Sequence, residues 1–382
     1  MKTPRTGLPT APEPTEANPV ATDPTSANPV VVNPADGKPV DLGPLVPVLF
    51  GFAAFQQLRA ASELQLFEYL TLNGPSTCDQ VAAGLRLPPK SARKLLLGTT
   101  SLGLTEHEEG RYAPSPMLRD AIDGGVWPLI RNIIDFQHRL SYLPAMEYAE
   151  SLRTGKNEGL KHLPGSGGDL YSRLEQALDL ENLFFRGMNS WSELSNPVLL
   201  HQVDYAGVRD LLDVGGGDAV NAIALARAHP HLRITVFDLE GATEVARDNV
   251  AAAGLADRIS VVAGDMFGDP LPDGFDLVLF AHQFVIWSPE QNRALLKRAH
   301  EALRPGGRVA VFNAFADDDG CGPLYTALDN VYFATLPAEE STIYRWSEHE
   351  DWLTAAGFAD ITRVRSDGWT PHGVIEGRKP DA

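Results

Sequence analysis

The sequence predicts an α/β protein in which a doubly wound, mostly parallel sheet follows a mainly helical winged-helix domain. From Val208 onward, apolar runs of strand length alternate with helical segments, which is typical of a parallel sheet with helices on both faces. Residues 45–120 contain helical patterns followed by a short hairpin, the order of a winged helix. We therefore expect four regions: an arm at 1–44, a winged-helix domain at 45–120, a helical connector at 121–205 and the sheet domain at 206–382.

The first region is a proline-rich arm. A proline stands at every fifth position from Pro4 to Pro44, and the residues between are mostly small and polar. Proline removes a backbone hydrogen-bond donor, and such side chains bury little surface. We expect this arm to be disordered, and we assign it no catalytic role.

The winged-helix prediction rests on three helical segments and a hairpin. A broad apolar face runs through residues 49–70. Two shorter helices are expected at Cys78–Leu85 and Pro89–Leu102, and Gly110-Arg111-Tyr112 is typical of a hairpin turn. A winged helix can bind DNA or pack against a second subunit, so the charge of the chain decides between these roles.

Composition argues against nucleic acid and membrane partners. The formal net charge is −18, and the segment that would contact DNA offers only Lys90, Arg93 and Lys94. No run approaches the roughly 18–20 apolar residues of a membrane helix, and we see no secretion signal. Cys78 and Cys321 are far apart in sequence, which fits a reducing compartment. We predict a cytoplasmic homodimer whose winged helix packs against its partner.

The connector at 121–205 carries an apolar stripe at helical spacing. Its members are Phe184, Phe185, Met188 and Trp191. Such a stripe usually forms part of a core. Because it lies just before a ligand-binding domain, we also name Met188 and Trp191 as candidate substrate contacts.

The loops after the strands of the C-terminal domain are the expected ligand sites, because ligands bind at the carboxyl ends of parallel strands. Gly215-Gly216-Gly217 allows a tight turn and close backbone approach. Asp238 ends the second strand, where a carboxylate can accept both hydroxyls of a ribose. Gly264-Asp265-Met266-Phe267 places an acid beside apolar side chains, which suits adenine. NAD is disfavoured because the third glycine of a dinucleotide fingerprint is absent, since Ala219 and Val220 follow the glycine cluster.

These Rossmann-like motifs resemble those of class I S-adenosylmethionine (SAM)-dependent methyltransferases, and in particular the small-molecule O-methyltransferases with an N-terminal winged-helix dimerisation domain. The matching stretches are LLDVGGGDA, VFDL, GDMF and LRPGGRVAV. The resemblance implies that SAM is the cofactor and that a small molecule accepts the methyl group. The implied cofactor-binding residues are Asp213, Gly215, Gly217, Asp238, Leu239, Asp265 and Met266.

The resemblance breaks in the stretch FAHQFVIWSPE, residues 280–290. Val285 stands where the family has its catalytic histidine, so that role is not carried over. Three explanations stay open: His282 is a relocated base, proximity alone suffices for an acidic acceptor, or a metal-bound 2-oxo acid is methylated on carbon. Phe284 and Trp287, from the same stretch, are further candidate substrate contacts.

The third explanation requires a divalent or ferric ion, for which the sequence shows no local ligand spacing. Its possible ligands are His282 with one of His138, His349 and His372. The acids after the fifth strand, Asp329, Glu339 and Glu340, are interpreted as solvated surface residues.

We predict a SAM-dependent methyltransferase that acts on a small molecule of specialised metabolism. O-methylation is the default that the resemblance implies. The alternative is metal-assisted C-methylation of a 2-oxo acid. A further alternative is a ligand-sensing winged-helix regulator with an inactive methyltransferase domain.

Overall fold

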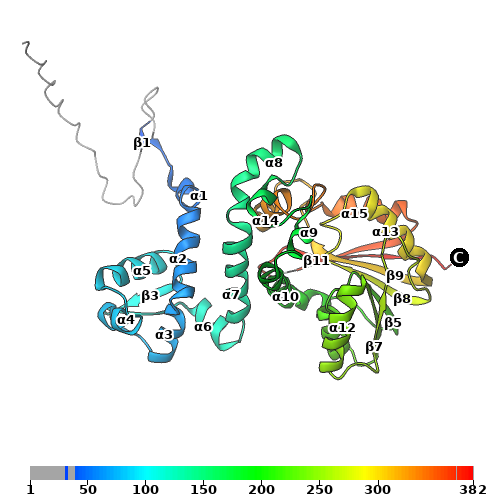
Figure 1. Cartoon of the computed structure of the whole chain (residues 1–382), viewed down its shortest axis with the longest axis horizontal. Coiled ribbons are helices and arrows are strands. Elements are labelled where there is room, and N and C mark those ends of the chain that lie inside the picture. Colours follow the sequence, from blue (N-terminus) through cyan, green and yellow to red (C-terminus); the bar gives the residue numbers. More distant parts are fainter. Residues whose placement is uncertain (1–30, 33–38, 367, 382) are drawn as a thin grey trace, which may run out of the picture.

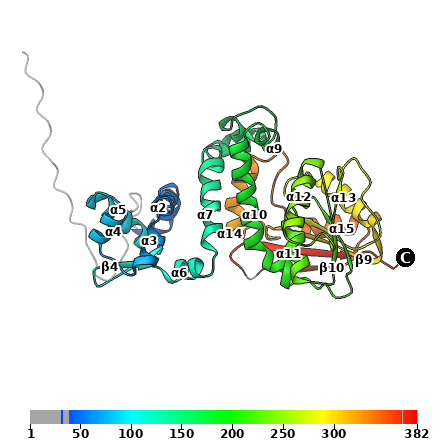
Figure 2. The ribbon, with the colours of Figure 1, turned by 60° about the horizontal axis from the view of Figure 1, so that its bottom comes forward.

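The computed structural model describes residues 31–32, 39–366 and 368–381, and it has an elongated shape (Figure 1). A small N-terminal domain lies at one end, the large sheet lies at the other, and long helices stand between them (Figures 1 and 2). Most of the predicted disordered arm lies outside the described residues. Its described part forms two short antiparallel strands, β1 (Val31–Val32) and β2 (Pro39–Val40). No helix in the described ranges is both long and apolar enough to span a membrane.

The N-terminal domain has the helices and hairpin that the sequence predicts, with one difference. The segment expected as one helix at 49–70 is broken at Gln65, whose φ of 58° is left-handed, so two helices meet there at an angle. A capping box between Thr77 and Gln80 starts the next helix. The elements are η1 (Gly43–Leu45), α1 (Val46–Leu49), α2 (Gly51–Glu63), α3 (Leu66–Asn73), α4 (Cys78–Gly84), α5 (Pro89–Ser101), β3 (Thr105–Glu108), β4 (Arg111–Pro114) and α6 (Pro116–Asp123).

An apolar surface remains exposed on the first two helices of this domain. Its side chains are Val46, Val48, Leu49, Phe50 and Phe52, all more than half exposed. They come from consecutive turns of α1 and α2, so they form one patch rather than scattered residues. An exposed apolar patch of this kind marks an interaction surface.

The connector is built around two long helices that pack side by side in both views, α7 (Trp127–Phe136) and α10 (Leu178–His201) (Figures 1 and 2). Gly187 permits the close approach of these helices, because a Cβ built there would lie 2.6 Å from the Phe136 ring. The remaining connector elements are η2 (Gln137–Ser141), η3 (Pro144–Glu147), α8 (Tyr148–Thr154), η4 (Glu158–His162) and α9 (Leu170–Leu174).

The sheet domain holds seven strands in the order β10-β11-β9-β8-β5-β6-β7. The five strands from β9 to β7 are parallel, and β10 and β11 are antiparallel to their neighbours. Strand order reverses between β5 and β8, so the crevice for a ligand opens at their carboxyl ends. The bounds are β5 (Asp210–Val214), β6 (Arg233–Asp238), β7 (Ile259–Ala263), β8 (Phe275–Ala281), β9 (Leu303–Ala314), β10 (Ala359–Arg365) and β11 (His372–Arg378).

Two hydrophobic cores cover the two faces of the sheet. One core contains residues of α10, α11 (Val220–Ala228) and α12 (Glu240–Ala252). The other contains residues of α13 (Pro289–Ala302) and α15 (Trp346–Ala355). Helix α14 (Leu324–Thr335) joins neither core and instead packs against the connector. As a result, α14 faces the crevice rather than the sheet.

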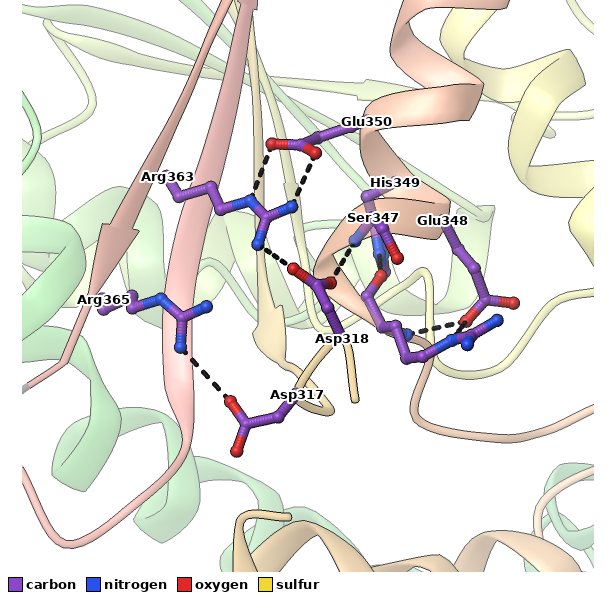
Figure 3. Close-up of polar contacts among 9 residues, drawn as sticks. Asp317, Asp318, Ser347, Glu348, His349, Glu350, Arg363 and Arg365 are labelled. Atoms are coloured by element: carbon purple, nitrogen blue, oxygen red, sulfur yellow. Dashed lines mark hydrogen bonds and ion pairs between the residues drawn. The ribbon is translucent and has the colours of Figure 1, made fainter. Parts of the chain in front are cut away.

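A network of charged residues holds the chain segment between β9 and α14 (Figure 3). Two carboxylates bind the Arg363 guanidinium: Glu350 at 2.7 and 2.6 Å, and Asp318. Asp318 also accepts the backbone N–H of Ser347 at 2.8 Å. These bonds join the segment to β10 and α15, and they fix the point from which α14 starts.

Candidate active site

A cavity of about 270 Å³ opens where the strand order reverses. Its floor is the glycine loop after β5 and the end of β8, and its walls come from α7, α9, α10 and α14. Aromatic side chains dominate those walls: Phe136, Tyr171, Phe184, Phe185, Trp191, Tyr325, Tyr332 and Phe333. Among the described residues that line it, none is a lysine or an arginine. The cavity therefore suits a planar, largely apolar molecule.

The glycine loop is shaped by positions that a side chain would disturb. Gly215 has a φ of 72°, and a Cβ there would lie 2.6 Å from Nε2 of Gln283. That same Nε2 donates a 3.0 Å hydrogen bond to the Gly215 carbonyl. Gly217, with a φ of 56°, donates its backbone N–H to Asp238 at 2.8 Å. This backbone presents polar groups to a ligand without obstruction, as a cofactor cradle requires.

Hydrogen bonds join the ends of three neighbouring strands. Asp238, at the end of β6, accepts the N–H groups of Gly217 and Leu239, and its carbonyl accepts the N–H of Gly264 after β7. Burial raises the pKa of the Asp238 carboxyl, and the two N–H groups oppose that rise. Asp213 lies fully buried beneath the loop, and burial raises its pKa to about 7. The loop predicted to bind the ribose and the loop predicted to bind the methionine part of the cofactor are therefore hydrogen-bonded to each other.

The loop after β7 that is predicted to bind adenine, residues 264–267, does not line the cavity. Asp265 is exposed, while Met266 and Phe267 pack partly buried against the core of α13 and α15. The Phe267 ring also meets the Trp287 ring edge-on at 5.0 Å. Trp287 thus lies beside the loop predicted to hold adenine and not in the wall of the cavity, where a substrate contact was expected.

His282 lies at the end of β8 in the cavity wall. Its backbone is left-handed, with a φ of 60°, and its N–H donates to the carbonyl of Phe312 at 2.7 Å. Its imidazole lies 5.2 Å from that of His372, at an angle of 75°. Burial lowers the pKa of His282 to about 4, and burial with the neighbouring His282 lowers the pKa of His372 well below its usual value. Both rings are therefore neutral near pH 7.

Phe284 is not a cavity residue, although Gln283, Val285 and Ile286 on either side of it line the cavity. Phe284 is instead fully buried in the core beside Phe280, and its carbonyl accepts an N–H from Nδ2 of Asn292. The prediction that Phe284 contacts substrate does not fit this position. Met188 and Trp191, from α10, line the cavity.

The predicted metal ligands do not assemble. His282 and His372 are neighbours, but His349 is buried between Phe284 and Trp352 with Nδ1 bonded to the Arg345 carbonyl. In the part of the chain that the structure describes, no group of three or more His, Cys, Asp or Glu side chains could hold a metal ion. Two neutral imidazoles do not form a complete ligand set, so we derive no step through a metal.

Asp329, from α14, lies where the sequence does not predict it. The sequence predicts a solvated surface acid, but Asp329 lines the aromatic cavity, and desolvation there raises the pKa of its carboxyl to about 7. The signal was present in the sequence: Tyr325, Asp329 and Tyr332 recur at i, i+4 and i+7, on one face of a helix. The other titratable groups of the cavity wall are Tyr171, Asp218, His282, Tyr325, Tyr332 and His372.

Comparisons with known proteins agree with this architecture. A model of the O-methyltransferase domain matches residues 146–359, and a model of the O-methyltransferase dimerisation domain matches residues 46–119. An L-tyrosine C(3)-methyltransferase of Streptomyces lavendulae is 45% identical over 88% of this chain and 92% of its own length. A 3-hydroxy-5-methyl-1-naphthoate 3-O-methyltransferase of Streptomyces sahachiroi is 32% identical over 88% and 94%.

Solved structures give the same result. The apo form of the S-adenosylmethionine-dependent methyltransferase SibL is 58% identical, with a TM-score of 0.84 over 89% of this chain and all of that one. Human N-acetylserotonin methyltransferase in complex with SAM is 26% identical, with a TM-score of 0.74 over 88% of this chain and 97% of that one.

The raised pKa of Asp329 predicts a pH-dependent stability. The folded protein holds a proton on Asp329 that the unfolded chain releases between about pH 4 and pH 7. The free energy of unfolding should therefore fall over this window as pH rises. Asparagine has no carboxyl that must stay protonated in the folded protein. The Asp329→Asn variant should therefore gain stability relative to the unmodified protein from pH 5 to pH 8. Urea unfolding measures the difference, and exposed Asp120→Asn is the control. A difference that is constant with pH would contradict the raised pKa of Asp329.

Proposed function

The chain belongs to the O-methyltransferase family with an N-terminal dimerisation domain, and we propose that it methylates a ring carbon of a phenolic amino acid of the tyrosine type. It is a SAM-dependent methyltransferase that acts on a small molecule in specialised metabolism. This proposal replaces O-methylation, the default from the sequence. What carries it is the 45% identity to an L-tyrosine C(3)-methyltransferase over 88% of this chain and 92% of that one. The aromatic cavity supports it, because a phenol ring can pack against such walls.

We propose that the cofactor binds in the cradle at the carboxyl ends of β5, β6 and β7. SAM, when bound, supplies a methyl group on a positively charged sulfur, and the sulfur keeps the electron pair of the S–C bond that breaks. We propose that the glycine loop holds the methionine part and that Asp238 and Leu239 hold the ribose. Asp265 and Met266 would hold the adenine, while Asp213 supports the loop from below.

The acceptor must become more nucleophilic at the carbon beside its hydroxyl. Removal of the O–H proton does this, because the phenolate shares its negative charge with that carbon. The ring then provides the electron pair of the new C–C bond. The hydrogen on the same carbon leaves as a proton while the oxygen recovers one, so each methylation releases one proton.

Asp329 is the proposed acceptor of the O–H proton. A general base works best when its pKa lies near the working pH, and the pKa of Asp329 is about 7. His282, with a pKa of about 4, is a much weaker base but a neutral hydrogen-bonding group that lines the same cavity. We assign His282 the role of orienting the phenol oxygen, which amends its predicted role as the base.

We propose that the enzyme works as a homodimer. Residues 46–119 match the dimerisation domain, and the exposed apolar patch on α1 and α2 lies in that range. Burying such a patch against a second copy removes it from water. The shortage of cations in the winged helix favours this use over DNA binding.

The position of the new methyl group tests the proposed function. Incubation with methyl-labelled SAM and L-tyrosine should give a product whose label is bonded to the ring carbon beside the hydroxyl, by NMR of the purified product. The hydroxyl should remain free. Label on oxygen, or no transfer to any phenolic amino acid, would refute ring methylation.

Variants at the two polar wall residues should separate their roles. Asp329→Asn should lower kcat/KM by about 10²–10⁴-fold, whereas His282→Ala should lower it at least about tenfold. In the unmodified enzyme kcat/KM should rise with pH and level off above about pH 7, because the ionised carboxylate is the active form. This rise should survive in His282→Ala and vanish in Asp329→Asn. The reverse pattern would make His282 the base.

A further inference from the structure

A second cavity, of about 380 Å³, adjoins the first. Tyr325 and His372 line both cavities, so the two spaces share a boundary. The wall of the second cavity comes from the segment between β9 and α14, the first turn of α14, the start of α15, the end of β10 and the residues just before β11. None of the proposed roles uses this space.

The two cavities differ in charge. The first is lined by the acids Asp218 and Asp329 and, among the described residues, by no lysine or arginine, whereas the second offers an arginine, Arg365, beside an acid, Asp317. An amino acid carries a carboxylate and an ammonium group on one carbon. Burying either charge unpaired among the aromatic walls of the first cavity is costly, so a tyrosine-type substrate that fills it requires a place for both charges outside those walls.

Arg365 is held in place but is only partly used by the protein (Figure 3). Its guanidinium lies 5.1 Å over the ring of Trp346, which is itself buried and stacked on Phe315 at 3.7 Å. The only hydrogen bond of its guanidinium within the described residues is Nη1 to Oδ1 of Asp317, at 3.2 Å. Its remaining donors can therefore bind a carboxylate in the two-point geometry that arginine favours.

Arg363, two residues earlier on β10, shows the contrast (Figure 3). Its guanidinium donates three hydrogen bonds to the carboxylates of Glu350 and Asp318, and its side chain is 22% exposed. The side chain of Arg365 is 54% exposed, and its pair with Asp317 is a surface ion pair, which contributes little to stability. Arg363 thus serves to hold the fold together, whereas Arg365 has donors that can bind a ligand.

We propose that the second cavity is the subsite for the amino-acid head group: Arg365 binds the α-carboxylate, and Asp317 binds the α-ammonium. This inference rests on the proposed function, since it assigns the charged end of the same substrate. The ring occupies the first cavity beside His282 and Asp329, and the side chain passes Tyr325 and His372. The head group inserts into an ion pair that already has the complementary charges.

Phenols that lack the carboxylate, the ammonium or both test whether Arg365 and Asp317 bind these groups. Arg365→Gln should raise KM for L-tyrosine and for 3-(4-hydroxyphenyl)propanoic acid at least about tenfold with little change in kcat, and it should leave 4-methylphenol unaffected. Asp317→Asn should do the same for tyramine, which has only the ammonium. Arg293→Gln is the matched control, because Arg293 is also partly exposed and paired with one carboxylate, Glu290 at 2.7 Å.

Equal losses for charged and uncharged phenols would overturn the subsite, since they would mean that Arg365 only supports the fold. An unchanged KM for L-tyrosine would overturn it too, while ring methylation itself would stand. If the unmodified enzyme methylates no phenol on carbon, the proposed function fails. Calorimetry of L-tyrosine with S-adenosylhomocysteine-loaded protein then decides the subsite: binding that Arg365→Gln weakens about tenfold supports it, and equal or absent binding refutes it.

Discussion

The architecture of the site depends on the contact between the glycine loop after β5 and the turn after β8. Gln283 donates to the Gly215 carbonyl at 3.0 Å, and a Cβ at Gly215 would collide with that same side chain. The contact joins the two strands between which the sheet reverses its order. It therefore places the proposed cofactor cradle beside His282, a polar residue that lines the acceptor cavity.

The aromatic walls then determine the chemistry of the polar groups among them. Burial disfavours charge, so it raises the pKa of Asp329 to about 7 and lowers that of His282 to about 4. The cavity consequently contains a carboxyl that can exchange a proton near neutral pH and an imidazole that stays neutral. Among the described residues that line the two cavities, an arginine occurs only in the second, where Arg365 pairs with Asp317. This separation suits a substrate with an aromatic ring at one end and ionic groups at the other.

Local patterns were enough to predict the parallel sheet, the winged-helix domain and the glycine loop, because strand periodicity and glycine spacing are properties of short segments. They were not enough for the cavity. Asp329 lies more than a hundred residues from Trp191 in sequence, and only the packing of α14 against the connector brings both to one wall. Phe284 was misplaced because the residues after β8 divide between cavity and core: Gln283, Val285 and Ile286 line the cavity, whereas Phe284 is fully buried in the core. An irregular segment of this kind has no period from which the sequence indicates the face of each side chain.

A crystal structure with S-adenosylhomocysteine and L-tyrosine tests this account most directly, because it measures which atom of the phenol faces the sulfur. The account predicts that the ring carbon beside the hydroxyl faces it, with the hydroxyl within about 3 Å of the Asp329 carboxylate and the head group beside Arg365. A phenol oxygen aimed at the sulfur, with Asp329 away from it, would contradict the account.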